Sequence, residues 1–195
     1  MHGLIFRGLQ SFVRDTYGAD TWSEVMQEAD LGFTCFEAML TYDDEISRKV
    51  LDLATVRLGK AQDDLLEDLG TYLVSHQNTQ SLRRLLRFGG VDFLDFLHSL
   101  DDLPDRARLA VPDLALPWLE LREMEDFSFT LRCGAGLPGY GHVMMGVLRA
   151  MADDYGALAF LELDESWEDY DAVRIVLLDE AFTEGRSFEL AQEAS

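Results

Sequence analysis

The chain has 195 residues, with 37 acidic and 16 basic side chains and a formal charge of −21 at pH 7. Its length allows one domain with a substantial core, and a hydrophobic content of 48% excludes a disordered chain. A surface this acidic repels phosphate groups, which argues against nucleic acid and membrane as partners.

The sequence contains neither a basic segment followed by an apolar leader nor an uninterrupted apolar run of about 18 residues. This pattern predicts a cytoplasmic protein. The two cysteines, Cys35 and Cys133, are far apart and form no Cys-x-x-Cys or Cys/His cluster. We therefore expect both to be buried free thiols.

Helices are predicted for most of the first ninety residues. The first covers residues 4–17, where apolar side chains share one face and a glycine follows. A capping box of Thr21 and Glu24 predicts a second helix over 22–29. Apolar residues at helical spacing predict further helices over 43–58, 62–74 and 82–88.

An amphipathic helix is predicted over residues 92–103. At about 100° per residue, its apolar side chains fall on one face and its acidic ones on the other. The apolar set is Phe93, Phe96, Leu97, Leu100 and Leu103, and the polar set is Asp92, Asp95, Ser99 and Asp102. Pro104 comes next, near the centre of the apolar face.

The composition changes at Pro104, because three of the four prolines lie between residues 104 and 117 and exclude one continuous helix there. Alternating apolar residues then predict a β-hairpin. The hairpin strands are expected at 118–122 and 127–132, a helix at 143–153, and two more strands at 157–163 and 173–178. This order predicts an α+β protein with an antiparallel sheet.

We expect a single domain over residues 1–184, followed by a polar tail over 185–195. Within the domain, a helical part covers about 1–60 and a mixed α/β part about 61–184.

Catalytic motifs are missing from the sequence: there is no Gly-x-Ser-x-Gly, His-Glu-x-x-His, phosphate-binding loop or dinucleotide-binding glycine pattern. A small metal-dependent enzyme that uses His98 with Asp95 or Asp102 is an alternative. One helix supplies too few ligands for a tight site, however, so we interpret His98 as a solvated side chain. We expect no catalytic residues and no metal site.

Short motifs are spread over nearly the whole chain. They are Met1-x-Gly3-Leu4-Ile5-Phe6, Tyr17-Gly18, Tyr42-Asp43-Asp44, Leu65–Tyr72, Phe96–Leu103, Pro117, and Gly139 followed by Gly146. In this order and spacing they resemble the heme nitric oxide/oxygen binding (H-NOX) domain family. The resemblance implies an H-NOX-like fold, with an N-terminal helical subdomain and a C-terminal antiparallel sheet with helices, which together enclose a heme.

The resemblance also shows where this chain departs from the family. In the family a histidine ligates the iron, and a Tyr-x-Ser-x-Arg motif holds the heme propionates. The histidine maps to Pro104, and the motif maps to Cys133, Ala135 and Leu137. Because the ligand and the propionate clamp are replaced together, we expect no heme bound by the family's motif.

The other positions that match the family's heme cavity are apolar: Ile5, Leu9, Pro117, Val143 and Val147. An empty void costs about 24 cal/mol per Å3, so we expect the cavity to be collapsed or to hold another apolar small molecule.

The resemblance implies a non-catalytic signalling module that regulates a partner protein, such as a histidine kinase or a cyclic-nucleotide enzyme. The alternative is a heme-based nitric oxide sensor whose iron ligand is not the family's.

Overall fold

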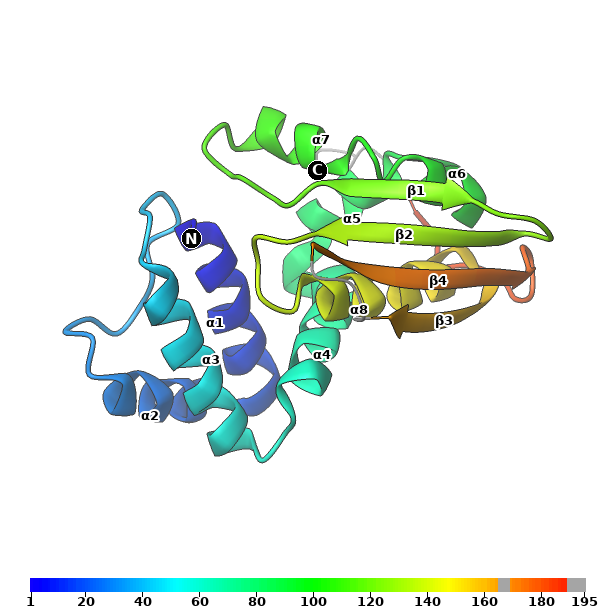
Figure 1. Ribbon diagram of the computed structural model, residues 1–195. Coiled ribbons are helices and arrows are strands. Elements are labelled where there is room, and N and C mark those ends of the chain that lie inside the picture. The colour runs from blue at the N-terminus through cyan, green and yellow to red at the C-terminus, as the bar shows by residue number, and fades with distance from the viewer. Residues whose placement is uncertain (165–168, 189–195) are drawn as a thin grey trace, which may run out of the picture.

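The computed structural model describes residues 1–164 and 169–188, and these form an α+β fold (Figure 1). The predicted fold class and antiparallel sheet are confirmed. The helices are α1 (Gly3–Tyr17), α2 (Ala19–Ala29), α3 (Asp44–Leu58), α4 (Gln62–Ser75), the short 3-10 helix η1 (Gln77–Thr79), α5 (Gln80–Arg87), α6 (Phe93–His98), α7 (Leu103–Ala110) and α8 (Tyr140–Tyr155). The strands are β1 (Leu119–Glu123), β2 (Ser128–Gly134), β3 (Leu158–Asp164) and β4 (Tyr170–Asp179).

The four strands form one antiparallel sheet in the order β1-β2-β4-β3. The helices described above cover the rear face of the sheet in Figure 1. On this face Leu131 pairs with Val173, and both side chains are fully buried. The opposite face is polar at its middle, where Arg174 of β4 pairs with Glu162 of β3. The alternation along the strands follows from the two-residue repeat of an extended chain.

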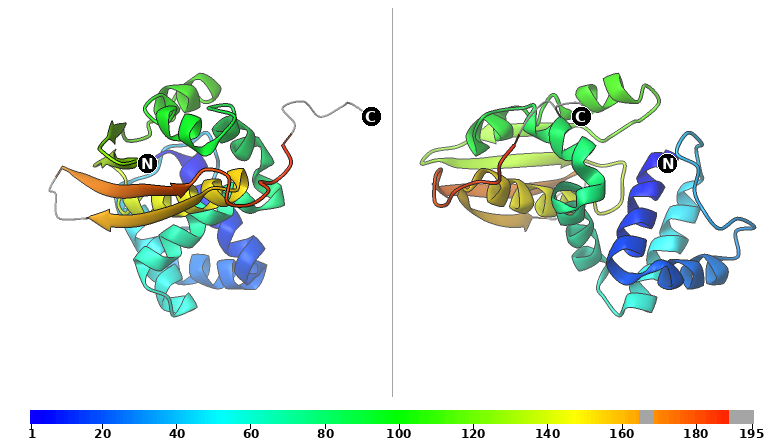
Figure 2. Two further views of the ribbon diagram at one scale, coloured as in Figure 1. Left: turned by 90° about the vertical axis from the view of Figure 1, so that its right-hand side faces the viewer. Right: turned by 180° about the vertical axis from the view of Figure 1, so that it is seen from behind.

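The buried side chains of the described residues form two hydrophobic cores. One lies among α1, α2, α3 and the first part of α4 and includes Phe6, Phe12 and Trp22. The other lies between the sheet and α5 to α8. Figure 2 shows α1–α3, which we call the helical lobe, to one side of α4, and the sheet with its helices, which we call the sheet lobe, to the other.

Helices α4 and α8 cross in direct backbone contact between the two cores. A Cβ atom on Gly70 would lie 2.0 Å from the Val143 carbonyl oxygen, and one on Gly146 would lie 1.9 Å from the Glu67 carbonyl oxygen. Only glycine allows so close an approach, because any other residue places a carbon atom in the contact. The packing of the lobes therefore depends on these two glycines.

The predicted helix over 92–103 is wrong in one respect, because it is broken after His98. Arg106 of α7 donates hydrogen bonds to the Ser99 carbonyl and hydroxyl oxygens at 2.8 and 3.1 Å. The carbonyl group that follows the last turn of α6 thus has a hydrogen-bond partner outside the helix. Asp101 accepts a hydrogen bond from the Leu121 backbone at 2.6 Å and ties the turn to β1. Pro104 then lies in the first turn of α7, where its missing N–H costs nothing.

Two local predictions need correction. Helix α2 begins at Ala19, before the predicted capping box, and the Thr21 hydroxyl donates to the Tyr17 carbonyl at 2.8 Å instead of capping α2. Helix α8 begins at Tyr140, three residues earlier than predicted. Both changes extend a helix toward a preceding glycine that ends the previous segment.

The described end of the chain packs against α8. The Thr183 and Arg186 backbone N–H groups donate to carbonyl oxygens at the end of α8, at 3.0 and 2.9 Å. Beneath this segment, the carboxylate of Asp154 is fully buried between Arg83, at 2.8 Å, and Arg87, at 3.6 Å. The first residues of the predicted tail thus contact the domain, and residues 189–195 lie outside the described residues.

Among the described residues, no helix combines the length and apolar character needed to cross a membrane.

Candidate functional site

A cavity of about 350 Å3 lies where the helical lobe meets the loop between β2 and α8. One wall consists of Met1, Asp44 and Arg48 from the helical lobe. The other consists of the loop Gly134–Gly139 together with Tyr170 and Asp171 at the start of β4. Residues from four distant segments of the sequence therefore meet at this cavity.

The wall of the helical lobe is held by the start of the chain. The Met1 ammonium donates to the Tyr42 carbonyl oxygen at 2.6 Å and lies 3.1 Å from an Asp44 carboxylate oxygen. The Tyr42 N–H donates back to the Met1 carbonyl at 2.9 Å. Arg48 follows Asp44 by one turn of α3, so positive and negative groups stand side by side on this wall.

The wall of the sheet lobe owes its shape to glycine. Gly136 and Gly139 have φ angles of 140° and 70°, which other residues rarely adopt. A Cβ atom on Gly139 would also lie 2.2 Å from the Leu66 side chain. Asp171 accepts a hydrogen bond from the Gly141 N–H at 3.1 Å, which places a carboxylate at the positive end of α8.

The predicted site residues separate into two groups. Ala135 and Leu137 line the cavity. The other seven are not among the lining residues. Leu9 belongs to the core of the helical lobe, Cys133 and Val147 belong to the core of the sheet lobe, Pro104 and Pro117 are buried, and Ile5 and Val143 are half-buried.

Sequence reasoning missed most of the cavity wall. Arg48, Tyr170 and Asp171 stand in no motif, and they line one cavity only because the lobes pack together. Asp44 belongs to a stretch that carries the family resemblance, but nothing in its spacing indicated a role at a cavity.

The residues predicted to stand at the family's ligand and clamp positions lack the side-chain groups that would hold heme. Pro104 is buried and its side chain has no atom that coordinates iron. Burial raises the pKa of the Cys133 thiol to about 12, so this side chain is neutral near pH 7 and is a poor ligand. Ala135 and Leu137 offer propionates neither charge nor a hydrogen-bond donor.

The cysteine and histidine predictions have different outcomes. Cys133 is a buried free thiol, as predicted, whereas Cys35 is exposed, because it lies in the loop between α2 and α3.

His98 is exposed, with its ring edge against Phe129 at a centroid distance of 6.0 Å. Within residues 1–164 and 169–188, no three His, Cys, Asp or Glu side chains are placed to hold a metal ion.

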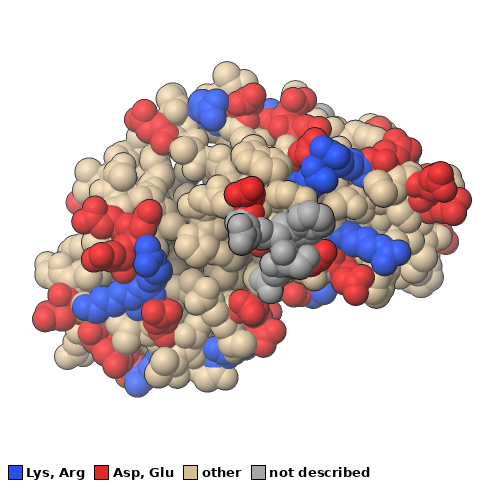
Figure 3. Space-filling view, viewed as in Figure 1, with Lys and Arg blue, Asp and Glu red and all other residues tan. Residues whose placement is uncertain are grey.

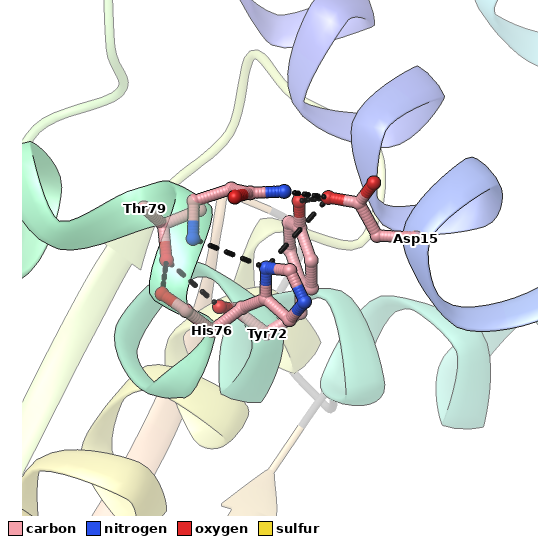
Figure 4. A network of polar contacts seen from close by, with 5 residues as sticks. Asp15, Tyr72, His76 and Thr79 are labelled. Atoms are coloured by element: carbon pink, nitrogen blue, oxygen red, sulfur yellow. Dashed lines mark hydrogen bonds and ion pairs between the residues drawn. The ribbon is translucent and has the colours of Figure 1, made fainter.

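A network of polar contacts joins the last turn of α1 to the end of α4, beside the junction of the lobes (Figure 4). An Asp15 carboxylate oxygen accepts hydrogen bonds from the Tyr72 hydroxyl at 2.6 Å and the Asn78 amide at 2.9 Å. The same oxygen lies 3.6 Å from His76 Nδ1. These hydrogen bonds, led by that of Tyr72, lower the pKa of Asp15 below its ordinary value.

The comparisons with known proteins agree with this fold. The model of the family described as Haem-NO-binding matches residues 2–159. The chain belongs to this family. A crystal structure of the Fe(II) unliganded H-NOX protein from K. algicida has a TM-score of 0.76 to this chain, with 19% identity, and the match covers 97% of this chain and 100% of that protein. At this identity the likeness shows that the H-NOX fold is shared.

Relatives in sequence are animal guanylate cyclases. Soluble guanylate cyclase 89Db of Drosophila melanogaster is 23% identical over 158 residues, which is 81% of this chain and 24% of that protein. Soluble guanylate cyclase gcy-31 of Caenorhabditis elegans is 25% identical over 154 residues, which is 79% of this chain and 22% of that protein. The chain thus spans about a quarter of the length of these relatives.

Proposed function

We propose that this chain is a non-catalytic regulatory domain that acts on a partner protein and does not hold heme in the manner of its family. The proposal that heme is not held in the family's manner rests on the buried Pro104 in the first turn of α7. An imidazole at this position would offer a nitrogen to iron, whereas the pyrrolidine ring offers only packing surface.

The clamp positions support the same proposal. A family-type clamp needs a guanidinium and two hydroxyl groups, and the corresponding residues are Leu137, Cys133 and Ala135. Had only the iron ligand been exchanged, the propionates would still need their charged partner. Cys133 and Val147 instead pack into the core of the sheet lobe, so we infer that part of the family's cavity is filled with side chains.

The proposed partner is a cyclic-nucleotide enzyme or a histidine kinase, attached to this chain or separate from it. The similarity to guanylate cyclases supports the first kind of partner. The 350 Å3 cavity is within the size range of small-molecule sites, and it lies between the lobes, where a bound molecule would change their packing. Its walls carry charged groups, so we infer a polar small molecule rather than the apolar one predicted from the sequence.

Heme titration tests the proposal. Purified protein mixed with hemin, reduced and desalted is expected to show no sharp, stoichiometric Soret band. Pro104→His alone is expected to leave the spectrum unchanged, since Cys133, Ala135 and Leu137 still lack a clamp. A variant that combines Pro104→His with Cys133→Tyr, Ala135→Ser and Leu137→Arg is the matched control for heme capacity.

A stoichiometric Soret band in the unaltered protein that shifts with nitric oxide would overturn the proposal and favour a heme sensor with another iron ligand. Tight heme uptake by the single Pro104→His variant would contradict the argument from the clamp.

A further inference from the structure

Large apolar side chains are exposed at one end of the sheet, far from the cavity. Met124 and Phe127 come from the β1–β2 turn, Phe160 from β3 and Leu178 from β4, and their exposed fractions are 59, 64, 51 and 62%. Val176 of β4 lies half-buried among these strands. We call these five residues the distal patch. Clusters of exposed apolar side chains on a folded protein mark interaction surfaces more often than isolated ones do.

The strand pairing makes the distal patch continuous. Phe160 and Ser128 both pair with Val176, from opposite sides, so the three side chains share the open face. Met124 donates its N–H to the Ser128 carbonyl at 2.8 Å, which brings the end of β1 into the same row. Leu178 is two residues beyond Val176 and therefore points to the same face.

The turn beside the distal patch is strained. Asp126 and Phe127 have φ angles of 57° and 53°, in the left-handed region. Such a conformation costs a non-glycine residue about 1 kcal/mol, and glycine would remove that cost. This chain instead places a largely exposed phenylalanine there, an arrangement that matches the use of strained residues at binding sites.

The rim of the distal patch is acidic. Glu123, Glu125, Asp126, Asp179 and Glu180 are all exposed on the ends of these strands and in the adjoining turns. Figure 3 shows acidic side chains crowded at this end of the molecule. Two copies of such a rim repel each other, and so do the rim and an anionic membrane. The complementary surface is apolar at its centre and basic around it.

We propose that the distal patch docks onto a partner protein that presents an apolar surface bordered by lysine and arginine. This inference rests on the proposed regulatory role, and it names the chemistry by which the partner is recognised. Phe127 and Phe160 are the anchors, because aromatic side chains contribute most to such interfaces. The acidic rim speeds association and makes it sensitive to salt.

The test uses a synthetic amphipathic helical peptide of leucine and lysine as the probe, with binding measured by fluorescence anisotropy. The double variant Phe127→Ser/Phe160→Ser is expected to bind about fivefold or more weakly than the unaltered protein. The matched control is Val91→Ser, which removes an 86% exposed apolar side chain from the loop between α5 and α6. The affinity of the control for the peptide is expected to stay within about twofold of that of the unaltered protein, because its charge and fold are unchanged.

Equal affinity in the double variant and the control would overturn the inference. So would binding of the unaltered protein to phosphatidylcholine vesicles that the double variant loses, or a dimer in sedimentation that the double variant loses. Circular dichroism checks that both variants fold. None of these measurements involves heme or the cavity, so failure here and failure of the proposed function can be told apart.

Discussion

Replacement of Gly146 by alanine tests how the two lobes are joined. The added Cβ atom would lie 1.9 Å from the Glu67 carbonyl oxygen and 2.8 Å from the Thr71 nitrogen. Both atoms belong to the backbone of α4, so no side chain can rotate away to relieve the contact. The helices must move apart, and the packing around their crossing loosens.

The expected loss follows from two opposing terms. Overpacking that moves a backbone costs about 3 kcal/mol, and the higher helix propensity of alanine returns about 1 kcal/mol. The net loss in the free energy of unfolding is about 2 kcal/mol. Gly8→Ala is the matched control, because its added Cβ atom would lie 3.9 Å from the Leu73 side chain, an ordinary contact. At this position the higher helix propensity of alanine should raise the free energy of unfolding by up to about 1 kcal/mol, with no overpacking to oppose it.

Urea unfolding followed by circular dichroism measures both changes. With a slope of about 2 kcal/mol per molar urea, the Gly146→Ala midpoint is expected about 1 M lower and the Gly8→Ala midpoint up to about 0.5 M higher. An unchanged or higher midpoint for Gly146→Ala, with the slope preserved, would refute the claim that α4 and α8 touch through their backbones.

Three further predictions concern charged and reactive groups. Since the pKa of Asp15 is lowered by folding, its contribution is present above the ordinary carboxyl pKa and is lost as the pH falls through the lowered value. Asp15→Asn should therefore lower stability by about 1 kcal/mol at pH 7, and the difference should shrink in urea titrations below about pH 4. Asp154→Asn leaves two nearly buried arginines without their counter-charge and should lower the free energy of unfolding by about 3–5 kcal/mol. The control Asp153→Asn, at an exposed position, should change it by less than about 0.5 kcal/mol. Equal urea midpoints for the two variants would contradict this prediction. With a thiol reagent near pH 8, Cys35 should react at once and Cys133 only on unfolding, because Cys133 is 1% exposed and its pKa is about 12.

Local patterns in the sequence were sufficient for the order and type of the elements. The helices over 43–58 and 62–74 and the hairpin of β1 and β2 follow from side-chain periodicity, which depends only on neighbours along the chain. The same holds for the burial of Phe93, Phe96 and Leu100, which have no exposed surface. Periodicity did not show the break after His98, because that break depends on hydrogen bonds that Arg106 donates to Ser99 and Leu121 donates to Asp101.

The candidate site was also predictable only in part from the sequence. The amino-acid types at Pro104, Cys133, Ala135 and Leu137 are properties of the sequence, and the chemistry that they lack can be read without coordinates. Whether these side chains line a space or pack into a core depends on how the lobes meet. That meeting depends on the contact of α4 with α8, in which each glycine faces a carbonyl oxygen of the other helix.

Which residues form the cavity wall and the distal patch is determined only by the tertiary structure. Met1 and Tyr170 are far apart in sequence and line one cavity, and Met124 and Phe160 reach the same end of one sheet face through strand pairing. Sequence alone determines which side chains are available and on which face of a helix or strand each one lies. Which faces meet is set by contacts between distant segments, and these become favourable only when the whole chain is packed.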